Sequence, residues 1–151
     1  MVKNVFKKLG KKQKNNKGFS LVELIVVIAI MAVLVGVLAP QLIKYVEKSR
    51  EATDIQTCDN IATALKTYYA DEEASATATP VTVTLGKTEL GTVADTAVKD
   101  AGLTKAKIKG TKWTDDKITI VYNKADGTIT YTGDSPYYHS DKDQFKKGPK
   151  S

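Results

Sequence analysis

The chain has 151 residues, of which 42% are hydrophobic and 26% are charged, and this composition excludes both a disordered chain and a protein with many membrane spans. Its net charge of +6 raises the question of a nucleic-acid partner. Seven of the 23 basic residues lie within residues 1–18, which hold no acid, so the remaining 133 residues carry 23 − 7 = 16 basic and 17 acidic side chains. The positive charge therefore belongs to a short N-terminal arm, and we predict no nucleic-acid partner.

The segment after this arm is a candidate membrane anchor. Residues 24–39 contain no polar side chain, and with residues 19–23 they would form a helix of about 31 Å, which matches the hydrocarbon core of a bilayer. A cleaved secretory signal is the alternative, but Pro40 would then directly follow the cut. Because lysines stay on the cytoplasmic side, we predict an uncleaved single span that exports the residues after it.

Helix-forming residues continue far beyond this span. No Gly or Pro occurs between Gln41 and Ala70, and apolar residues recur there at steps of three and four. We predict one nearly continuous helix from about Ser20 to about Ala70, although the stretch 47–54 is polar. The apolar stripe consists of Ile55, Cys58, Ile61, Ala62, Leu65, Tyr68 and Tyr69.

Pro40 is the one proline in this predicted helix. It cannot donate to the carbonyl of Gly36, which carries no side chain to resist a distortion. We therefore expect a kink or a local opening at Gly36 and Pro40, with a simple proline stop as the alternative. Cys58 lies on the apolar stripe, so we interpret it as a small buried hydrophobe and not as a reactive thiol.

Short strands follow the helix. Alternating apolar residues predict strands at 81–85, 118–122 and 129–131, and Asp126-Gly127 predicts a hairpin turn between the last two. Residues 75–80 read as a loop, and residues 95–101 as a short helix. We expect Asp95 to cap that helix and Gly102 to end it, and Trp113 and the tyrosines to cover one face of the sheet.

The polar tail from Gly133 onward is predicted to be a loop that wraps the sheet edge or frays. Too little chain remains for a second core, so the sheet must pack on the long helix. The predicted fold class is α+β: a long N-terminal helix, apolar in its first half and amphipathic in its second, packed against a small antiparallel sheet head.

Reactive groups are too few to suggest an enzyme. His139 and Cys58 are the single histidine and cysteine, they lie in different predicted elements, and they are too few for a zinc site. Oxygen ligands for calcium are offered by Asp134, Asp141 and Asp143, but their spacing fits solvated loop charge better. We predict no catalytic residue, no metal site and no cofactor.

Glu23 stands at the start of the apolar run, where an unpaired carboxylate is costly. A cut between Gly18 and Phe19 would remove the lysine arm and create an α-amino group four residues before Glu23. If the amine of a neighbouring copy paired with Glu23, the pair would set the register between two helices. The alternative is that Glu23 snorkels to the surface of a permanent anchor.

The segment KGFSLVE (residues 17–23), the apolar run and Pro40 together resemble the N-terminus of a type IV prepilin of the type IVa kind. The resemblance implies that a prepilin peptidase removes the leader 1–18 after Gly18 and methylates the Phe19 amine, and that Phe19 and Glu23 are assembly residues. Residues 19–45 would be a membrane anchor and then a filament core, and residues 46–151 the head. The lone cysteine excludes a C-terminal disulfide, which suggests a Gram-positive, clostridial-type source.

The resemblance implies a major pilin, the structural subunit of a surface filament for adhesion, surface motility or biofilm. Its partners would be further copies of itself, the prepilin peptidase and the pilus assembly machinery. The precursor would lie in the cytoplasmic membrane with its N-terminus inside, and the assembled pilus outside the cell. One alternative is a pseudopilin of a type II secretion or DNA-uptake machine, and another is a membrane-anchored binding domain that forms no polymer.

Overall fold

The computed structural model describes residues 18–71, 79–91 and 94–151. The predicted leader up to residue 17 and most of the predicted loop 75–80 lie outside the described residues. The chain divides into two compact units between Pro40 and Gln41. The second unit, Gln41–Ser151, contains all the strands that the structure describes, and it is called the head from here on.

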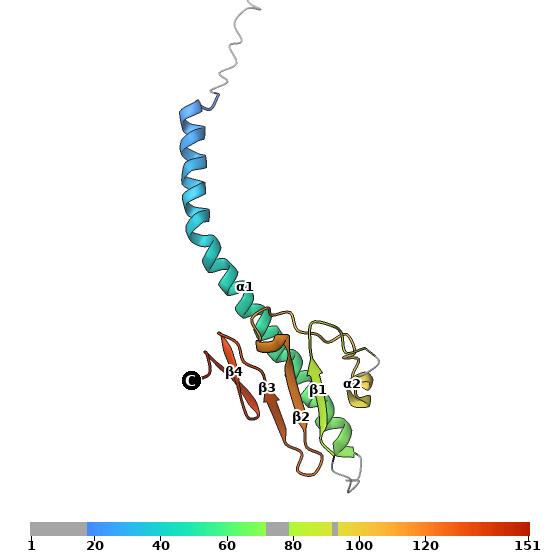
Figure 1. Cartoon of the computed structure of the whole chain (residues 1–151). Coiled ribbons are helices and arrows are strands. Elements are labelled where there is room, and N and C mark those ends of the chain that lie inside the picture. Colours follow the sequence, from blue (N-terminus) through green and yellow to red (C-terminus); the bar gives the residue numbers. More distant parts are fainter. Residues whose placement is uncertain (1–17, 72–78, 92–93) are drawn as a thin grey trace, which may run out of the picture. The chain divides into compact units, whose positions relative to one another are not determined.

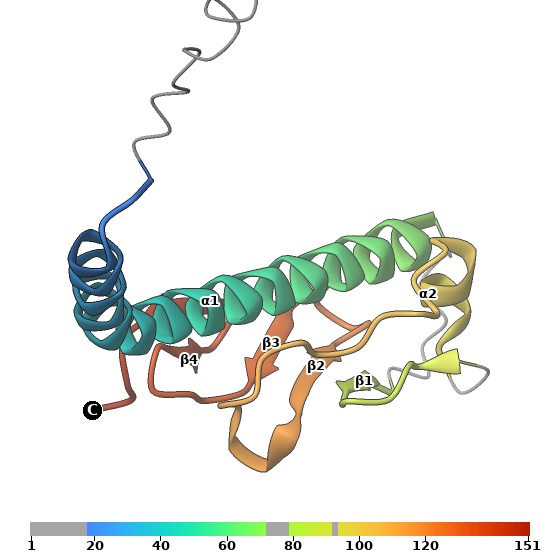
Figure 2. The same cartoon turned by 90° about the horizontal axis from the view of Figure 1, so that it is seen from above.

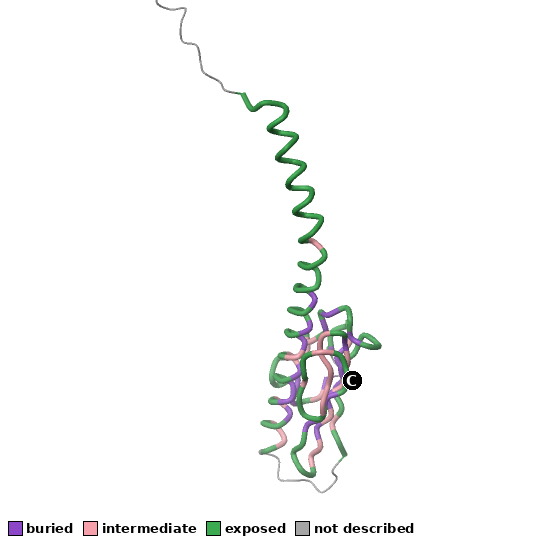
Figure 3. Tube along the Cα trace, turned by 90° about the vertical axis from the view of Figure 1, so that its left-hand side faces the viewer, coloured by how far each residue is buried: buried purple, intermediate pink, exposed green. Residues whose placement is uncertain are grey.

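Helix α1 runs from Leu21 to Asp71, a length of 51 residues, and confirms the predicted long helix (Figure 1). Its assignment continues through Pro40, so proline does not end the helix here. From residue 18 to residue 40 the chain is exposed almost throughout, as the green part of the tube shows (Figure 3). Among the described residues, α1 is the one helix long and apolar enough to cross a membrane. The kink at Gly36 and Pro40 stays a prediction.

The second half of α1 buries the predicted apolar stripe. Cys58, Ile61 and Leu65 are completely buried, as the helical spacing requires. Burial raises the pKa of the Cys58 thiol, since a thiolate would lose its hydration. The interpretation of Cys58 as a small core residue is therefore confirmed.

A three-stranded antiparallel sheet packs against this stripe (Figure 2). It consists of β1 (Val81–Leu85), β2 (Ile118–Tyr122) and β3 (Ile129–Thr132), in the order β1-β2-β3. The register places Val83 opposite Ile120 and Ile120 opposite Tyr131, and all three side chains are buried in the core. The predicted strands and the α+β fold class are confirmed.

Two local predictions are also confirmed. Helix α2 (Thr96–Asp100) is capped by Asp95, whose carboxylate accepts a hydrogen bond of 3.0 Å from the Ala97 N–H. Gly102, with φ of 71°, follows it, as a left-handed residue after a helix often does. The β2–β3 turn is closed by the Asn123 N–H, which donates to the Thr128 carbonyl at 2.9 Å. A short 3₁₀ turn, η2 (Thr114–Asp116), precedes β2.

The prediction of a C-terminal loop is wrong. The tail forms a hairpin of β4 (Tyr138–Asp141) and β5 (Gln144–Lys147), which is hydrogen-bonded to the end of β3 through the Tyr131 N–H and the Lys142 carbonyl at 2.7 Å. No alternation of apolar residues marks these strands, because both remain half-buried or exposed. Two aromatic side chains from these strands, Tyr138 and Phe145, pack against the core, and the Phe145 ring lies 5.7 Å from the Trp113 ring.

Candidate functional site

The N-terminus of α1 holds the predicted processing and assembly residues. Residues 18–20 are not helical, and the Ser20 carbonyl accepts the first helical hydrogen bond, from the Leu24 N–H at 3.1 Å. The Ser20 N–H donates to Oε2 of Glu23 at 3.2 Å. Ser20 and Glu23 have the spacing of a capping box, in which the acid three residues on accepts from the capping residue. In the uncut chain Glu23 therefore caps its own helix, where the helix dipole favours negative charge.

Phe19 lies just outside the helix and is 92% exposed. The helical relation that we expected between Phe19 and Glu23 is not formed in the uncut chain, because α1 begins only at Leu21. A side chain added at Gly18 would meet nothing within 4 Å. The fold itself thus does not require glycine at position 18, and the bond after it is exposed.

Within its own unit, the apolar half of α1 has no partner among the described residues 18–40. Eight side chains between Leu24 and Leu34 are each about half exposed, and they lie on every side of the helix. Such a surface is far more apolar than a soluble protein leaves in contact with water. Lipid or other helices must therefore cover it. These side chains are Leu24, Ile25, Val26, Val27, Ile28, Ile30, Met31 and Leu34.

Sequence reasoning missed a second set of residues, in the polar stretch 47–54. Asp54 is buried and accepts the backbone N–H groups of Lys109 and Gly110, each at 2.7 Å. The indole N–H of Trp113 donates to the same carboxylate at 2.9 Å. One aspartate on α1 therefore holds the segment that leads into β2.

Two glutamates extend this buried acidic cluster, which we define as Glu47, Glu51 and Asp54. Glu47 accepts the backbone N–H of Thr111, and Glu51 accepts the hydroxyl of Ser135. Among the residues that the structure describes, no group donates to Oε1 of Glu51. Burial raises the pKa of Glu51, the Ser135 hydrogen bond opposes this shift, and the charges of Glu47 and Asp54 add to it.

The spacing of the three acids in the sequence could have predicted that they lie on the buried face of α1. Positions 47, 51 and 54 continue the steps of Cys58, Ile61 and Leu65 toward the N-terminus. One buried face thus runs from residue 47 to residue 65 and changes from acidic to apolar. Hydrophobicity alone does not detect such a face, because its acidic part is satisfied by backbone and side-chain hydrogen-bond donors and not by apolar contacts.

We expect Glu51→Gln to raise the urea midpoint of unfolding at pH 7. The pKa of Glu51 is higher in the folded than in the unfolded state, so the charged form destabilises the fold at neutral pH. Protonation removes this cost as the pH falls toward the ordinary value of 4.5. The advantage of the variant should therefore shrink on acidification, as measured by Trp113 fluorescence of the detergent-solubilised chain.

Glu89→Gln is the matched control, since Glu89 is exposed and forms only a surface ion pair of 3.6 Å with Lys107. Its midpoint should stay close to that of the parent chain. A Glu51→Gln chain that is less stable at pH 7, or whose advantage is independent of pH, would contradict the prediction.

The aspartates considered for calcium lie in the C-terminal hairpin region. Asp141 pairs with Lys146, whose hydrogen bond and charge hold the pKa of Asp141 below its usual range, and Asp134 lies 3.8 Å from the Lys150 ammonium. Across the described ranges, no three His, Cys, Asp or Glu residues are placed to hold one metal ion. Two of the three aspartates, Asp134 and Asp141, therefore lie next to a lysine ammonium.

Residues 13–39 match the model of the prokaryotic N-terminal methylation motif. The N-terminus of this chain therefore carries the prokaryotic N-terminal methylation motif. Over 78 residues the chain is 38% identical to a protein of Clostridium perfringens named prepilin peptidase-dependent protein A. The aligned region covers 50% of this chain and 55% of that relative, so the chain spans about half the length of the curated protein it matches. No solved structure gives a significant match.

The methylation motif contains four of the five residues singled out from the sequence, and the fifth, Pro40, directly follows it. The four are Gly18, Phe19, Glu23 and Gly36. Together with the relative, it confirms the predicted resemblance to type IV pilin-like proteins. Both findings agree with a structural subunit and not an enzyme. The apolar start of α1, which lies within the motif, fits a membrane-anchored precursor.

Proposed function

We propose that this chain is the structural subunit of a type IV pilus. A prepilin peptidase cuts after Gly18 and methylates the new amine of Phe19. Until assembly, the apolar half of α1 anchors the subunit in the cytoplasmic membrane. The pilus assembly machinery then moves subunits out of the membrane, and copies of the chain polymerise through this helix into an extracellular filament for adhesion, surface motility or biofilm.

The observation that carries the proposal is the exposed apolar helix with a single acid in its first turn. A permanent anchor needs only the apolar surface, and Glu23 adds nothing to its fit in lipid. In a bundle of identical helices, the same surface is buried by neighbours. The charge of Glu23 then meets the Phe19 amine of an adjacent copy, which sets the axial register of the filament.

Two further observations support cleavage after Gly18. A side chain added at this glycine would meet nothing within 4 Å, so a requirement for glycine would come from outside the chain. The relative from Clostridium perfringens is named for its dependence on a prepilin peptidase, which supports the same enzyme as a partner here.

The test compares fibres on cells that carry Glu23→Ala, Glu23→Gln or Glu23→Asp. Gln keeps an oxygen that accepts the Ser20 N–H, so it preserves the cap while it removes the charge. If charge pairing drives assembly, both Ala and Gln should reduce surface fibres by at least about tenfold, since a lost buried pair costs several kcal/mol. Asp keeps the charge on a shorter side chain and should retain part of the assembly. Electron microscopy gives the fibre count.

Mass spectrometry of the membrane fraction is the control for processing. All three variants should begin at methylated Phe19, because none alters the bond that is cut. Fibres as abundant in Glu23→Gln as in the parent would contradict the proposal and leave Glu23 as a helix cap. Processed protein without long fibres on parent cells would instead favour the pseudopilin of a secretion or DNA-uptake machine.

A further inference from the structure

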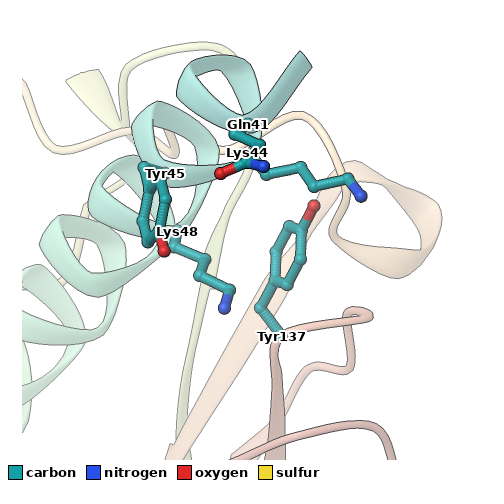
Figure 4. A pocket seen from close by; sticks show the side chains of 5 residues that line it. All are labelled: Gln41, Lys44, Tyr45, Lys48 and Tyr137. Atoms are coloured by element: carbon teal, nitrogen blue, oxygen red, sulfur yellow. The ribbon is translucent and has the colours of Figure 1, made fainter. Parts of the chain in front are cut away.

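A basic and aromatic groove lies in the head, where the second half of α1 meets the C-terminal hairpin. Its volume is about 300 Å³, and Figure 4 shows the side chains of Lys44 and Lys48 reaching from α1 toward the Tyr137 ring. The Lys48 ammonium lies 5.4 Å from the centre of that ring, within the range of a cation–π contact. The lining residues are Gln41, Lys44, Tyr45, Lys48 and Tyr137.

A second hollow shares Lys48 and Tyr137 with this groove and adds Lys147 and Gly148 at the end of β5. Among the residues that the structure describes, Lys44, Lys48 and Lys147 form no ion pair with a carboxylate. The acid next to Lys48 in the sequence, Glu47, is buried, accepts the Thr111 N–H and lines neither hollow. The combined site therefore presents unneutralised positive charge, which suits an anion.

The place of the groove in the chain indicates where that anion comes from. Lys44 and Lys48 follow the last residue of the apolar run, Ala39, by five and nine positions, or about 8 and 14 Å of helix. The headgroup layer of a bilayer extends about 5–8 Å beyond each side of its hydrocarbon core. Lysine side chains reach several ångströms along a surface, so both ammonium groups come within reach of lipid phosphates.

The residues around the lysines have the composition of a membrane interface. Leu42 and Ile43 are 63% and 69% exposed, and Tyr45 is 67% exposed. Apolar side chains next to tyrosine and lysine are typical of helix segments at the headgroup level. A head that stood free in water would leave this apolar surface uncovered, whereas lipid would cover it.

We propose that the groove binds the headgroup of an anionic phospholipid in the outer leaflet of the membrane before the subunit is assembled. Lys44 and Lys48 bind the phosphate, Lys147 adds to the attraction, and Tyr45 and Tyr137 line the groove around the headgroup. The inference depends on the membrane-anchored precursor of the proposed function, and not on the filament. The lipid would hold the head at the surface until assembly extracts the chain.

The test uses the purified full chain in a micelle of an uncharged sugar detergent. Dihexanoyl phosphatidylglycerol is added below its micelle concentration, and the amide NMR signals of residues 41–48 and 136–148 are followed. Saturable shifts are expected with this lipid, and much weaker shifts with dihexanoyl phosphatidylcholine or with inorganic phosphate. The double variant Lys44→Gln/Lys48→Gln should bind the lipid at least about tenfold more weakly, since two lysines near an anionic surface together contribute at least this factor to the affinity.

The matched control is Lys66→Gln/Lys105→Gln, which removes the same charge from two exposed positions outside the groove. It should bind the lipid as the parent does. Equal weakening in both double variants, or equal binding of phosphatidylcholine, would overturn the proposal in favour of diffuse attraction. Inorganic phosphate that binds as tightly as the lipid would overturn it in favour of a free anion.

A further outcome concerns a second copy of the chain as the occupant. If the groove variant alters self-association but leaves lipid binding unchanged, the groove faces another subunit and the proposal fails. Flotation of the parent chain with phosphatidylcholine vesicles tests the membrane anchor separately. A chain that floats without specific lipid binding refutes this inference alone, and a chain that does not float refutes the anchor.

Discussion

Replacing Asp54 with alanine is expected to lower the free energy of unfolding of the head by about 4 kcal/mol, because two buried donors and one partly buried donor lose their acceptor together. These donors are the N–H groups of Lys109 and Gly110 and the indole N–H of Trp113. The loss is a large share of the 5–15 kcal/mol that a domain typically has. It should appear as a fall in the thermal midpoint of about 15 °C, measured by near-UV circular dichroism of the detergent-solubilised chain.

Asp59→Ala is the matched control on the same helix. The Asp59 carboxylate accepts one hydrogen bond, from the Tyr131 hydroxyl at 3.0 Å, and the loss of this bond should cost about 1 kcal/mol. Each variant removes one aspartate carboxylate from α1, and the two differ in the number of hydrogen-bond donors that are left unpaired. If Asp54→Ala were no more damaging than Asp59→Ala, Asp54 would not anchor the segment before β2.

Gly110→Ala is expected to destabilise the head by about 3 kcal/mol, the upper end of the cost of overpacking a well-packed site. A Cβ atom at Gly110 would lie 2.7 Å from Cγ of Glu51, 2.8 Å from the indole nitrogen of Trp113 and 2.9 Å from Oδ2 of Asp54. The backbone would have to move away from α1, which would lengthen the hydrogen bond to Asp54. The urea midpoint of unfolding should fall, and the fluorescence maximum of Trp113 should shift because its surroundings move.

Gly86→Ala provides the comparison, because an added Cβ at Gly86 meets nothing within 4 Å. The urea midpoint of unfolding of this variant should stay close to that of the parent chain. A Gly110→Ala chain of parental stability would show that the backbone relaxes at little cost, and that the close approach of residue 110 to the acidic cluster is not needed for the fold.

Much of the fold could be predicted from local patterns. The run of apolar residues to Ala39 and the stripe through Cys58 and Leu65 located α1 to within one residue at each end. Alternation located β1, β2 and β3, since each of them buries one face. The same rule failed for the hairpin β4–β5, because strands that bury neither face show no alternation and depend on hydrogen bonds to a neighbouring strand.

The candidate site also has one part that could be predicted from the sequence and one part that could not. The methylation motif is a contiguous segment, so the residues from Gly18 to Glu23 could be recognised without a structure. The capping bond between Ser20 and Glu23 also spans only three residues, and its spacing is visible in the chain. The acidic cluster is different, because its partners lie 55 to 84 positions away in the sequence.

The amino-acid sequence by itself determined the prepilin-type N-terminus, the long helix and the strands that bury one face, because each depends on residues close together in the chain. Only the tertiary structure decided which donors satisfy Glu47, Glu51 and Asp54, and that Tyr137 meets the lysines of α1 in one groove. The physical reason is that a hydrogen bond or a groove between distant segments depends on where the later segments pack against α1. Local periodicity does not determine that packing.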